Sequence, residues 1–259
     1  MASAFDPSIA SLRTSLDDFD GSEDLDASWS DAHSSFLSSL SEDETADLLK
    51  FARKKCLEPR DFLFRAGDHS SDVFIVAEGC VRLFQVSSAG KETILWFSFP
   101  GEIFGIAELL SGSNREIYAD ANETTVVYAV KRADFARFLG NHPEAAMRAI
   151  GILSARVRTL GHALVGLATD NVETRIAHLL LRFARVSTMP PCPETCGDEL
   201  CVNVRLTHQD IANLIGASRQ TVTSTLVEMK KSGALRYANR HIHIVSPNRL
   251  GRILALVDS

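Results

Sequence analysis

The feature that most constrains the fold is a seam of apolar residues at heptad spacing that follows Pro143. Successive members lie four and three residues apart in alternation, over more than three heptads. The seam consists of Ala146, Ile150, Leu153, Val157, Leu160, Leu164 and Leu167. Two paired helices need so long a seam, whereas a single helix on a globular surface seldom does. We therefore expect residues 143–169 to form the dimerisation helix of a homodimer, with a helix packed only on its own domain as the alternative.

Short apolar runs separated by glycines precede this helix, between Asp61 and about Val130. They read "FLFRAGD", "VFIVAEG", "CVRLFQVSSAGK", "TILWFSFPGEIFG" and "TTVVYAV". Brief strands with glycine turns, and with no helices between them, are typical of an antiparallel sandwich or barrel. Residues 35–142 are therefore expected to form a double-stranded, jelly-roll-like β-roll, and the whole chain is expected to be of the α+β class.

Two segments precede the strands. Residues 1–34 contain eight acidic residues against the single basic Arg13 and have few apolar side chains, so we expect a disordered acidic tail. The next segment, "FLSSLSEDETADLLKFARKKCL", predicts a short amphipathic helix whose start is marked by a capping box of Ser41 and Glu44. The apolar residues at helical spacing in this segment are Leu48, Leu49, Phe51 and Leu57.

The segment "LTHQDIANLIGASRQTVTSTLVEMKKSGAL" predicts a helix-turn-helix. Thr207 is expected to cap the first helix, and Ser218 the second. Gly216 permits the positive backbone angle of the turn, and the small Ala212, four residues earlier, lets the two helices approach closely. The expected core positions are Ile211, Leu214, Ile215, Val222, Leu226 and Met229. This arrangement is the one that lays a second helix in the major groove of DNA.

Polar residues begin that second helix. Arg219 carries a side chain that donates two hydrogen bonds to guanine, and Gln220 one that pairs in the same way with adenine, while a solvated polar face is the alternative. The following "LRYANRHIHIVS" predicts a two-stranded wing whose turn contacts phosphate. The candidate DNA contacts are Thr207, Ser218, Arg219, Gln220, Thr221, Thr223, Ser224, Arg240 and His241.

A bend is expected between the dimerisation helix and the helix-turn-helix. Asp170 and Glu173 suggest a fresh capping box, so a second helix should run through "VETRIAHLLLRFARV" after a bend near Thr169. The Pro- and Cys-rich "STMPPCPETCGDELC" then reads as a loop. We therefore assign residues 170–200 to a hinge helix and linker, and residues 201–259 to a winged helix-turn-helix domain.

The charge is unevenly spread along the chain. A net charge of −6 argues against a generally basic nucleic-acid binder, but residues 205–259 hold eight Lys or Arg against three acidic residues. This locally basic end suits double-stranded DNA as the partner. No basic leader precedes an apolar stretch, and no apolar run approaches the roughly 18 residues of a membrane span. We expect a cytoplasmic protein without a membrane partner.

The order of these parts, from about residue 36 to residue 250, resembles the CRP/FNR family of bacterial transcription regulators. Its most specific pieces are "FRAGD" and "PGEIFG" in the β-roll, and "HQDIANLIGASRQTVTS", which looks like the family's recognition unit. The resemblance implies a homodimer that binds an inverted-repeat operator, with RNA polymerase as a further partner. It also implies a sensor role for the β-roll and no enzymatic activity.

The resemblance also implies an effector position in the β-roll and against the long helix. The matching residues are Gly105, Glu108, Arg115, Glu116 and Leu160. Members that bind cyclic AMP carry Gly-Glu and later Arg-Ser, whereas here Gly105 is followed by Ile and Arg115 by Glu116. The Glu116 carboxylate beside Arg115 repels a cyclic phosphate unless it turns away. Leu160 and Gly161 also stand where the cyclic-AMP receptor uses two hydroxyl residues to bond adenine, so cyclic AMP is not expected. Arg115 is left to pair with another anion or with Glu116, and the effector is either a different small molecule or absent.

Three cysteines in the linker raise a rival hypothesis. Cys192, Cys196 and Cys201 are spaced so that, with His208, they form candidate ligands for zinc or an iron-sulfur cluster in a metal- or thiol-based redox regulator. The spacing matches no specific motif, so free thiols in a flexible loop are the favoured interpretation. Cys56 and Cys80 are expected to be small core residues.

Overall fold

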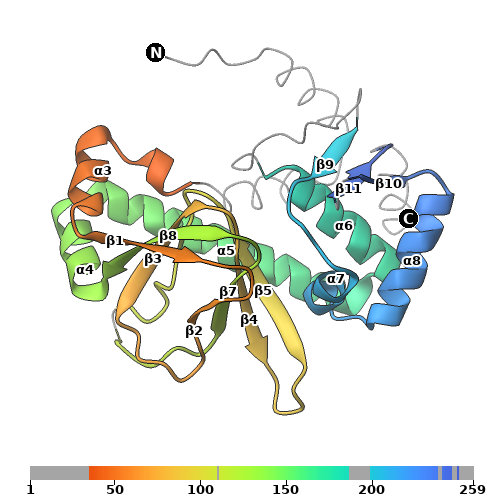
Figure 1. The fold of residues 1–259 in the computed structure, drawn as a ribbon, viewed down its shortest axis with the longest axis horizontal. Coiled ribbons are helices and arrows are strands. Elements are labelled where there is room, and N and C mark those ends of the chain that lie inside the picture. Colours follow the sequence, from red (N-terminus) through yellow and green to blue (C-terminus); the bar gives the residue numbers. More distant parts are fainter. Residues whose placement is uncertain (1–34, 110, 187–198, 239–240, 247–249, 251–259) are drawn as a thin grey trace.

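The computed structural model describes residues 35–186, 199–238, 241–246 and Leu250, with the exception of residue 110. A β-roll is followed by a long helix, a second helix and a smaller C-terminal unit (Figure 1). This is the predicted α+β architecture. No helix within the described ranges combines the length and apolar character that crossing a membrane requires.

The β-roll consists of two four-stranded antiparallel sheets. The first has the order β1 (Ala52–Leu57), β8 (Thr125–Lys131), β3 (Asp72–Glu78) and β6 (Ile103–Phe104). The second has the order β2 (Phe62–Phe64), β7 (Tyr118–Ala121), β4 (Val81–Val86) and β5 (Glu92–Ser98). Their buried residues include stacked Phe64, Phe74 and Phe104. The short runs of the sequence therefore form the predicted sandwich.

The helix predicted at the start of the ordered chain is shorter than its apolar spacing suggested. A 3-10 turn, η1 (Leu37–Ser39), precedes α3 (Glu42–Leu49), and the capping box of Ser41 and Glu44 is confirmed. The prediction was wrong for Phe51 and Leu57, because the next six residues form β1 and pair along their whole length with β8. Cross-strand hydrogen bonds to β8 outweigh the local helical preference here.

Cys56 lies in β1 rather than in a helix, and its side chain is exposed, so its prediction as a core residue was wrong. Strand residues alternate between faces, and at this edge strand Cys56 points outward. Cys80 is fully buried, as expected, and its burial raises the pKa of the thiol well above the ordinary value. Cys80 is therefore a structural thiol.

Two helices follow the β-roll, and only the second runs toward the C-terminal unit (Figure 1). The short α4 (Arg132–Asn141) is followed by α5 (Pro143–Thr169), whose bounds agree with the predicted dimerisation helix. One face of α5 is buried and consists of Ala145, Ala149, Ile152, Ala155 and Thr159. Arg156 fastens this face to the β-roll, since it donates to the Ile103 carbonyl at 2.8 Å and to the Glu102 carboxylate at 3.1 Å.

The apolar seam lies on another face of α5 and has no cover in the described single chain. Val157 and Leu164 are each 69% exposed, and the other large members of the seam are also exposed. The helix therefore packs on its own domain through one face and leaves a second apolar face open. This arrangement is what the heptad spacing predicts for a helix that pairs with a copy of itself.

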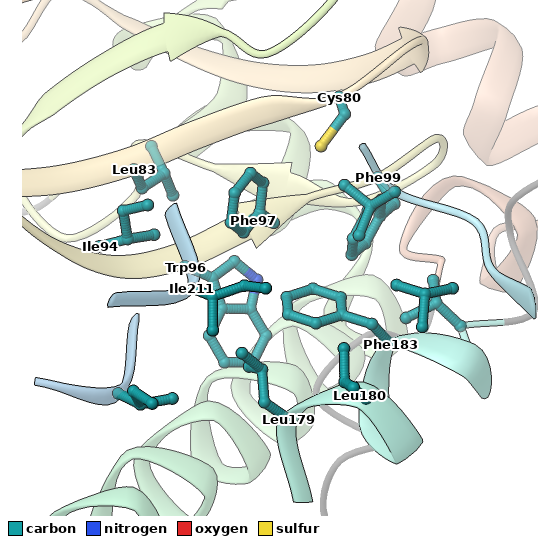
Figure 2. Close-up of a cluster of buried hydrophobic side chains, with 14 of the residues drawn as sticks. Cys80, Leu83, Ile94, Trp96, Phe97, Phe99, Leu179, Leu180, Phe183 and Ile211 are labelled. Atoms are coloured by element: carbon teal, nitrogen blue, oxygen red, sulfur yellow. The ribbon is translucent and has the colours of Figure 1, made fainter. Parts of the chain in front are cut away.

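The bend after α5 occurs where it was predicted, but its cap differs. Asp170 ends α5, and Asn171 caps α6 (Val172–Ala184) by accepting a hydrogen bond from the Thr174 amide at 2.9 Å. The predicted capping box of Asp170 and Glu173 was therefore wrong by one residue. Phe183 of α6 makes edge contacts with Phe97 and Phe99, so α6 packs directly against the β-roll (Figure 2).

Within its described residues, the C-terminal unit includes helices α7 (His208–Ile215) and α8 (Arg219–Lys231) and three short strands. The strands β9 (Leu200–Val202), β10 (Leu235–Ala238) and β11 (His241–Ile244) form one antiparallel sheet in the order β10, β11, β9. The wing was predicted with two strands, and β9 is the strand that the prediction missed. It was assigned to a loop because three residues are too few to show periodicity.

Candidate nucleic-acid interface and effector position

Both helices of the helix-turn-helix begin at the capping residues that the sequence predicted. Thr207 accepts a hydrogen bond from the Asp210 amide, and the Asp210 carboxylate accepts one from the Thr207 amide, which completes a capping box at α7. Gly216 ends α7 in the left-handed region at φ 67°, and Ser218 caps α8. Ile211, Ala212, Ile215, Val222, Leu226 and Met229 are buried, and Leu214 is half-buried. The caps and core thus fix the direction of α8.

The start of α8 presents a polar face. Arg219, Gln220, Thr221 and Ser224 are exposed, and Thr223 is half-buried. Several hydroxyls in this region bond within the motif, because Thr223 shares a hydrogen bond of 2.9 Å with His208 Nδ1 and Ser224 donates to the Gln220 carbonyl at 3.0 Å. Neither the Arg219 nor the Gln220 side chain makes a hydrogen bond to the described residues. These two long side chains are therefore the ones placed to reach a partner.

Of the two predicted wing contacts, His241 lies within the described residues. His241 opens β11 and is half-buried, opposite Ala238 of β10. Arg240, which was predicted to contact phosphate, lies outside the described residues. The ammonium group of Lys230, near the end of α8, lies 5.7 Å from the centroid of the Tyr237 ring. This cation–π contact joins α8 to strand β10 of the wing.

Arg115 lies in a site that the protein itself fills. It is only 4% exposed, and its Nη1 atom donates to Glu108 at 2.7 Å and to the Gly105 carbonyl at 2.9 Å. Its Nη2 atom donates to the Asp72 carbonyl, and the guanidinium lies 4.4 Å from the centroid of the Phe64 ring. Burial of a charge is tolerated when it is paired and hydrogen-bonded in this way. The guanidinium is therefore held by internal partners.

The predicted effector residues are only partly brought together. Gly105, Glu108 and Arg115 form one cluster, but Glu116 points to solvent. The predicted pairing of Arg115 with Glu116 was therefore wrong, and so was the predicted repulsion of a cyclic phosphate by Glu116. Glu116 follows Arg115 directly, and adjacent residues near a strand face opposite sides, which explains the difference. Leu160 lies apart from this cluster, on the exposed seam of α5.

The cysteine hypothesis gains no support. Cys201 is a buried residue of β9, opposite His243 of β11, rather than a member of a flexible loop. Cys192 and Cys196 lie outside the described residues. His208 bonds to Thr223, and the described part of the chain contains no cluster of three or more His, Cys, Asp or Glu side chains able to hold a metal ion.

The sequence interpretation missed a buried network that joins the β-roll to the helix-turn-helix. Arg82 of β4 donates to both oxygens of Asp120 at 2.9 and 2.6 Å. Its Nη1 atom also reaches Glu92 at 3.2 Å and Asp210 of α7 at 3.4 Å. Burial lowers the pKa of Arg82, but the hydrogen bond and charge of Asp120, with Glu92 and Asp210, raise it above its ordinary value overall. The only sequence signal was a charged residue inside each of the apolar strands "VRLFQV" and "YADA".

Two family models match the chain. A cyclic nucleotide-binding domain matches residues 54–142, and a Crp-like helix-turn-helix domain matches residues 174–253. The chain is 29% identical over 194 residues to the cyclic AMP receptor protein of Thermus thermophilus, which covers 74% of this chain and 84% of that protein. It is 27% identical over 207 residues to the CRP-like cAMP-activated global transcriptional regulator of Mycobacterium tuberculosis, which covers 78% and 90%.

The fold is shared with solved regulators. The structure of FixK2 from Bradyrhizobium japonicum superposes with a TM-score of 0.67 at 22% identity, and covers 78% of this chain and 96% of that one. The β-roll, the helices and the helix-turn-helix thus follow one another as they do in that fold. The first matched domain contains the sheets around Arg115, and the second contains the exposed start of α8. The chain belongs to the CRP/FNR family of transcription regulators.

Proposed function

We propose that the protein acts as a homodimer that binds double-stranded DNA with sequence specificity, at an inverted repeat. Each copy contributes one α8 to the major groove, so the half-sites should lie about one helical turn apart, roughly 10 base pairs centre to centre. The seam on α5 supplies the dimer contact. RNA polymerase is the further partner. The chain then divides into a tail (residues 1–34), a sensor (35–142), a dimerisation helix (143–169), a hinge (170–200) and a DNA-reading domain, the reader (201–259).

The observation that carries this proposal is the exposed pair Arg219 and Gln220 at the first turn of α8. The Ser218 cap and the buried Val222, Leu226 and Met229 fix that turn, so the two side chains are displayed from a rigid element. Arginine and glutamine are the side chains that make paired hydrogen bonds to guanine and adenine edges. A rigid platform is what base discrimination requires.

Selection of bound sequences from a randomised DNA pool tests the proposal. The purified protein should enrich an inverted repeat whose half-sites have the spacing given above. Running the selection aerobically and again anaerobically with reductant separates a contribution of the cysteines from that of α8. Enrichment of single half-sites without a repeat would contradict the dimeric arrangement.

Arg219→Ala is expected to weaken specific binding by about 1–3 kcal/mol and to relax the choice of the base beneath it. The reason is the loss of a paired hydrogen bond to one base edge, while phosphate contacts remain. Lys231→Ala is the matched control, since Lys231 lies at the other end of α8 and pairs with Glu228 at 3.0 Å. Competition binding against operators mutated at each position measures both variants. Unchanged base preference in Arg219→Ala would show that another residue reads that position.

We further propose that any effector is a molecule other than cyclic AMP. Calorimetric titration with cyclic AMP is expected to give no saturable heat, because Glu108, Gly105 and Asp72 already satisfy the Arg115 guanidinium. A cyclic phosphate would have to displace the Glu108 carboxylate from a buried site, and Coulomb repulsion between the two anions opposes this. Saturable binding that is lost in Arg115→Gln would overturn this prediction.

A further inference from the structure

Val227 is an apolar side chain on the polar face of α8. It is 42% exposed, whereas the other large apolar side chains of the helix, Val222, Leu226 and Met229, are buried in the hydrophobic core. Figure 1 shows α8 at the outer edge of the C-terminal unit. The packing of the helix on its own domain therefore does not require an apolar residue at position 227.

The helical repeat places Val227 among the residues proposed to contact bases. Each residue turns the helix by about 100°, so Val227 lies about 40° from Thr223 and about 20° from Gln220 around the axis. Arg219 lies about 80° away, on the same side of the helix. At about 1.5 Å per residue, Thr223 and Val227 lie roughly 6 and 12 Å beyond Arg219 along the axis. Thr223 and Val227 thus extend the face that begins with Arg219.

The hydroxyl groups of this face already use their hydrogens within the protein. Thr223 Oγ1 donates to the Arg219 carbonyl at 2.8 Å, so His208 Nδ1, at 2.9 Å, is the donor in the bond that it shares with this hydroxyl. Ser224 Oγ donates to the Gln220 carbonyl at 3.0 Å. Because a hydroxyl has one hydrogen, neither side chain has a donor left for a base edge. What Thr223 has left to place against a base is its methyl group.

We propose that Thr223 and Val227 recognise the 5-methyl group of thymine in the major groove. This inference rests on the DNA-binding function proposed above and adds an apolar contact to the polar ones of Arg219 and Gln220. Thymine presents a methyl group in that groove and cytosine does not, so an apolar side chain distinguishes the two bases by contact. Packing a thymine methyl group against Val227 also removes exposed apolar surface from water, which favours binding.

The spacing along α8 limits where these thymines lie in the operator. Val227 lies roughly 12 Å beyond Arg219, which corresponds to about four base steps of 3.4 Å. Each half-site should therefore contain A·T pairs within about four base pairs of the pair whose recognition depends on Arg219.

Replacing thymine by uracil removes the 5-methyl group and leaves every hydrogen-bonding group of the base in place. In a thymine-to-uracil scan of the selected operator, competition titrations with the full-length protein should identify positions at which binding weakens about fourfold for each methyl group lost. Thr223→Ser should abolish the sensitivity of one such position, since it keeps the hydroxyl bonds and removes the methyl group of the side chain. Val227→Ala should abolish the sensitivity of another.

Thr225→Ser is the matched control for these variants. It also removes one methyl group from α8, and the Thr225 hydroxyl also donates to a helix carbonyl, that of Thr221 at 3.0 Å. Thr225 lies about 200° from Thr223 around the helix, away from the proposed contact, so every position should keep its sensitivity to uracil. Thermal unfolding shows whether the fold is retained, and Val227→Ala should not lower the midpoint, because alanine favours helix more than valine does.

Specific operator binding without any effect of uracil would overturn the methyl contacts while leaving the DNA-binding function intact. Sensitivity that persists in both Thr223→Ser and Val227→Ala would also overturn the proposal, since another residue would then contact the methyl groups. Loss of sensitivity in Thr225→Ser would do the same, because it would trace the effect to the helix as a whole. A selection that enriches no operator would instead contradict the DNA-binding function, and this inference with it.

Discussion

The double variant Val157→Asp, Leu164→Asp is expected to be a folded monomer that has lost about 10²–10⁴-fold in operator affinity. Both side chains are 69% exposed in the single chain and lie one heptad apart on α5. In a paired helix each would meet its copy across the two-fold axis, so four buried carboxylates would face one another. The two DNA-reading domains would then bind their half-sites independently, without the raised effective concentration that a dimer gives to the second binding step. Light scattering and operator titration measure the two effects.

Val165→Asp is the matched control for this prediction. Val165 is also a β-branched apolar residue of α5 and is 60% exposed, but it directly follows Leu164 and so points about 100° away from it around the helix. It should leave the dimer and the operator affinity unchanged. If Val165→Asp dissociates the protein and the double variant does not, the paired face of α5 is a different one. The thermal unfolding of both variants shows whether the fold is retained.

Local signals in the sequence predicted most of the reader. Caps and turns depend on one or a few neighbouring residues, so Thr207, Gly216 and Ser218 could be placed before the structure was known. The heptad seam on α5 was readable for a similar reason, because its period repeats along one helix. Glycine-separated apolar runs were enough to indicate the β-roll, although not the pairing of its strands.

Features that depend on distant partners could not be predicted in this way. The end of α3 was misplaced because β8, some 70 residues later, recruits the segment into β1. For Arg115 the sequence left open a pairing with another anion or with the neighbouring Glu116, whereas folding brings Glu108 to it from another turn of the loop. The capping residue of α6 was missed by one position, which is the usual scale of uncertainty at a helix boundary. In each case the local sequence was compatible with both structures, and contacts with residues distant in the sequence determined which one formed.

Arg82→Met is expected to destabilise the protein by about 3–5 kcal/mol, which is the cost of leaving a buried carboxylate without its partner. Asp120 is 2% exposed and receives both of its short hydrogen bonds from Arg82. Methionine keeps an apolar stem but loses the guanidinium, whose carbon lies 4.5 Å from the centroid of the Phe84 ring, so the change removes the ion pairs together with this cation–π contact. Denaturant unfolding monitored by circular dichroism gives the free energy. Arg53→Met is the control, because the Arg53 side chain is 56% exposed where it pairs with Asp72.

Asp210→Asn separates the stability of the β-roll from its link to the reader. Asp210 uses one carboxylate oxygen in the Thr207 cap and the other toward Arg82 at 3.4 Å, so asparagine is able to keep the cap but loses the charge attraction. It should therefore cost far less stability than Arg82→Met, yet increase amide hydrogen exchange in α7, where the reader meets β5. Equal destabilisation by the two variants would mean that the attraction between Asp210 and Arg82, rather than the Asp120 pair, accounts for most of the stability that Arg82 provides. Unchanged exchange in α7 would mean that Arg82 serves the β-roll alone, since the Asp120 pair would then account for its whole effect.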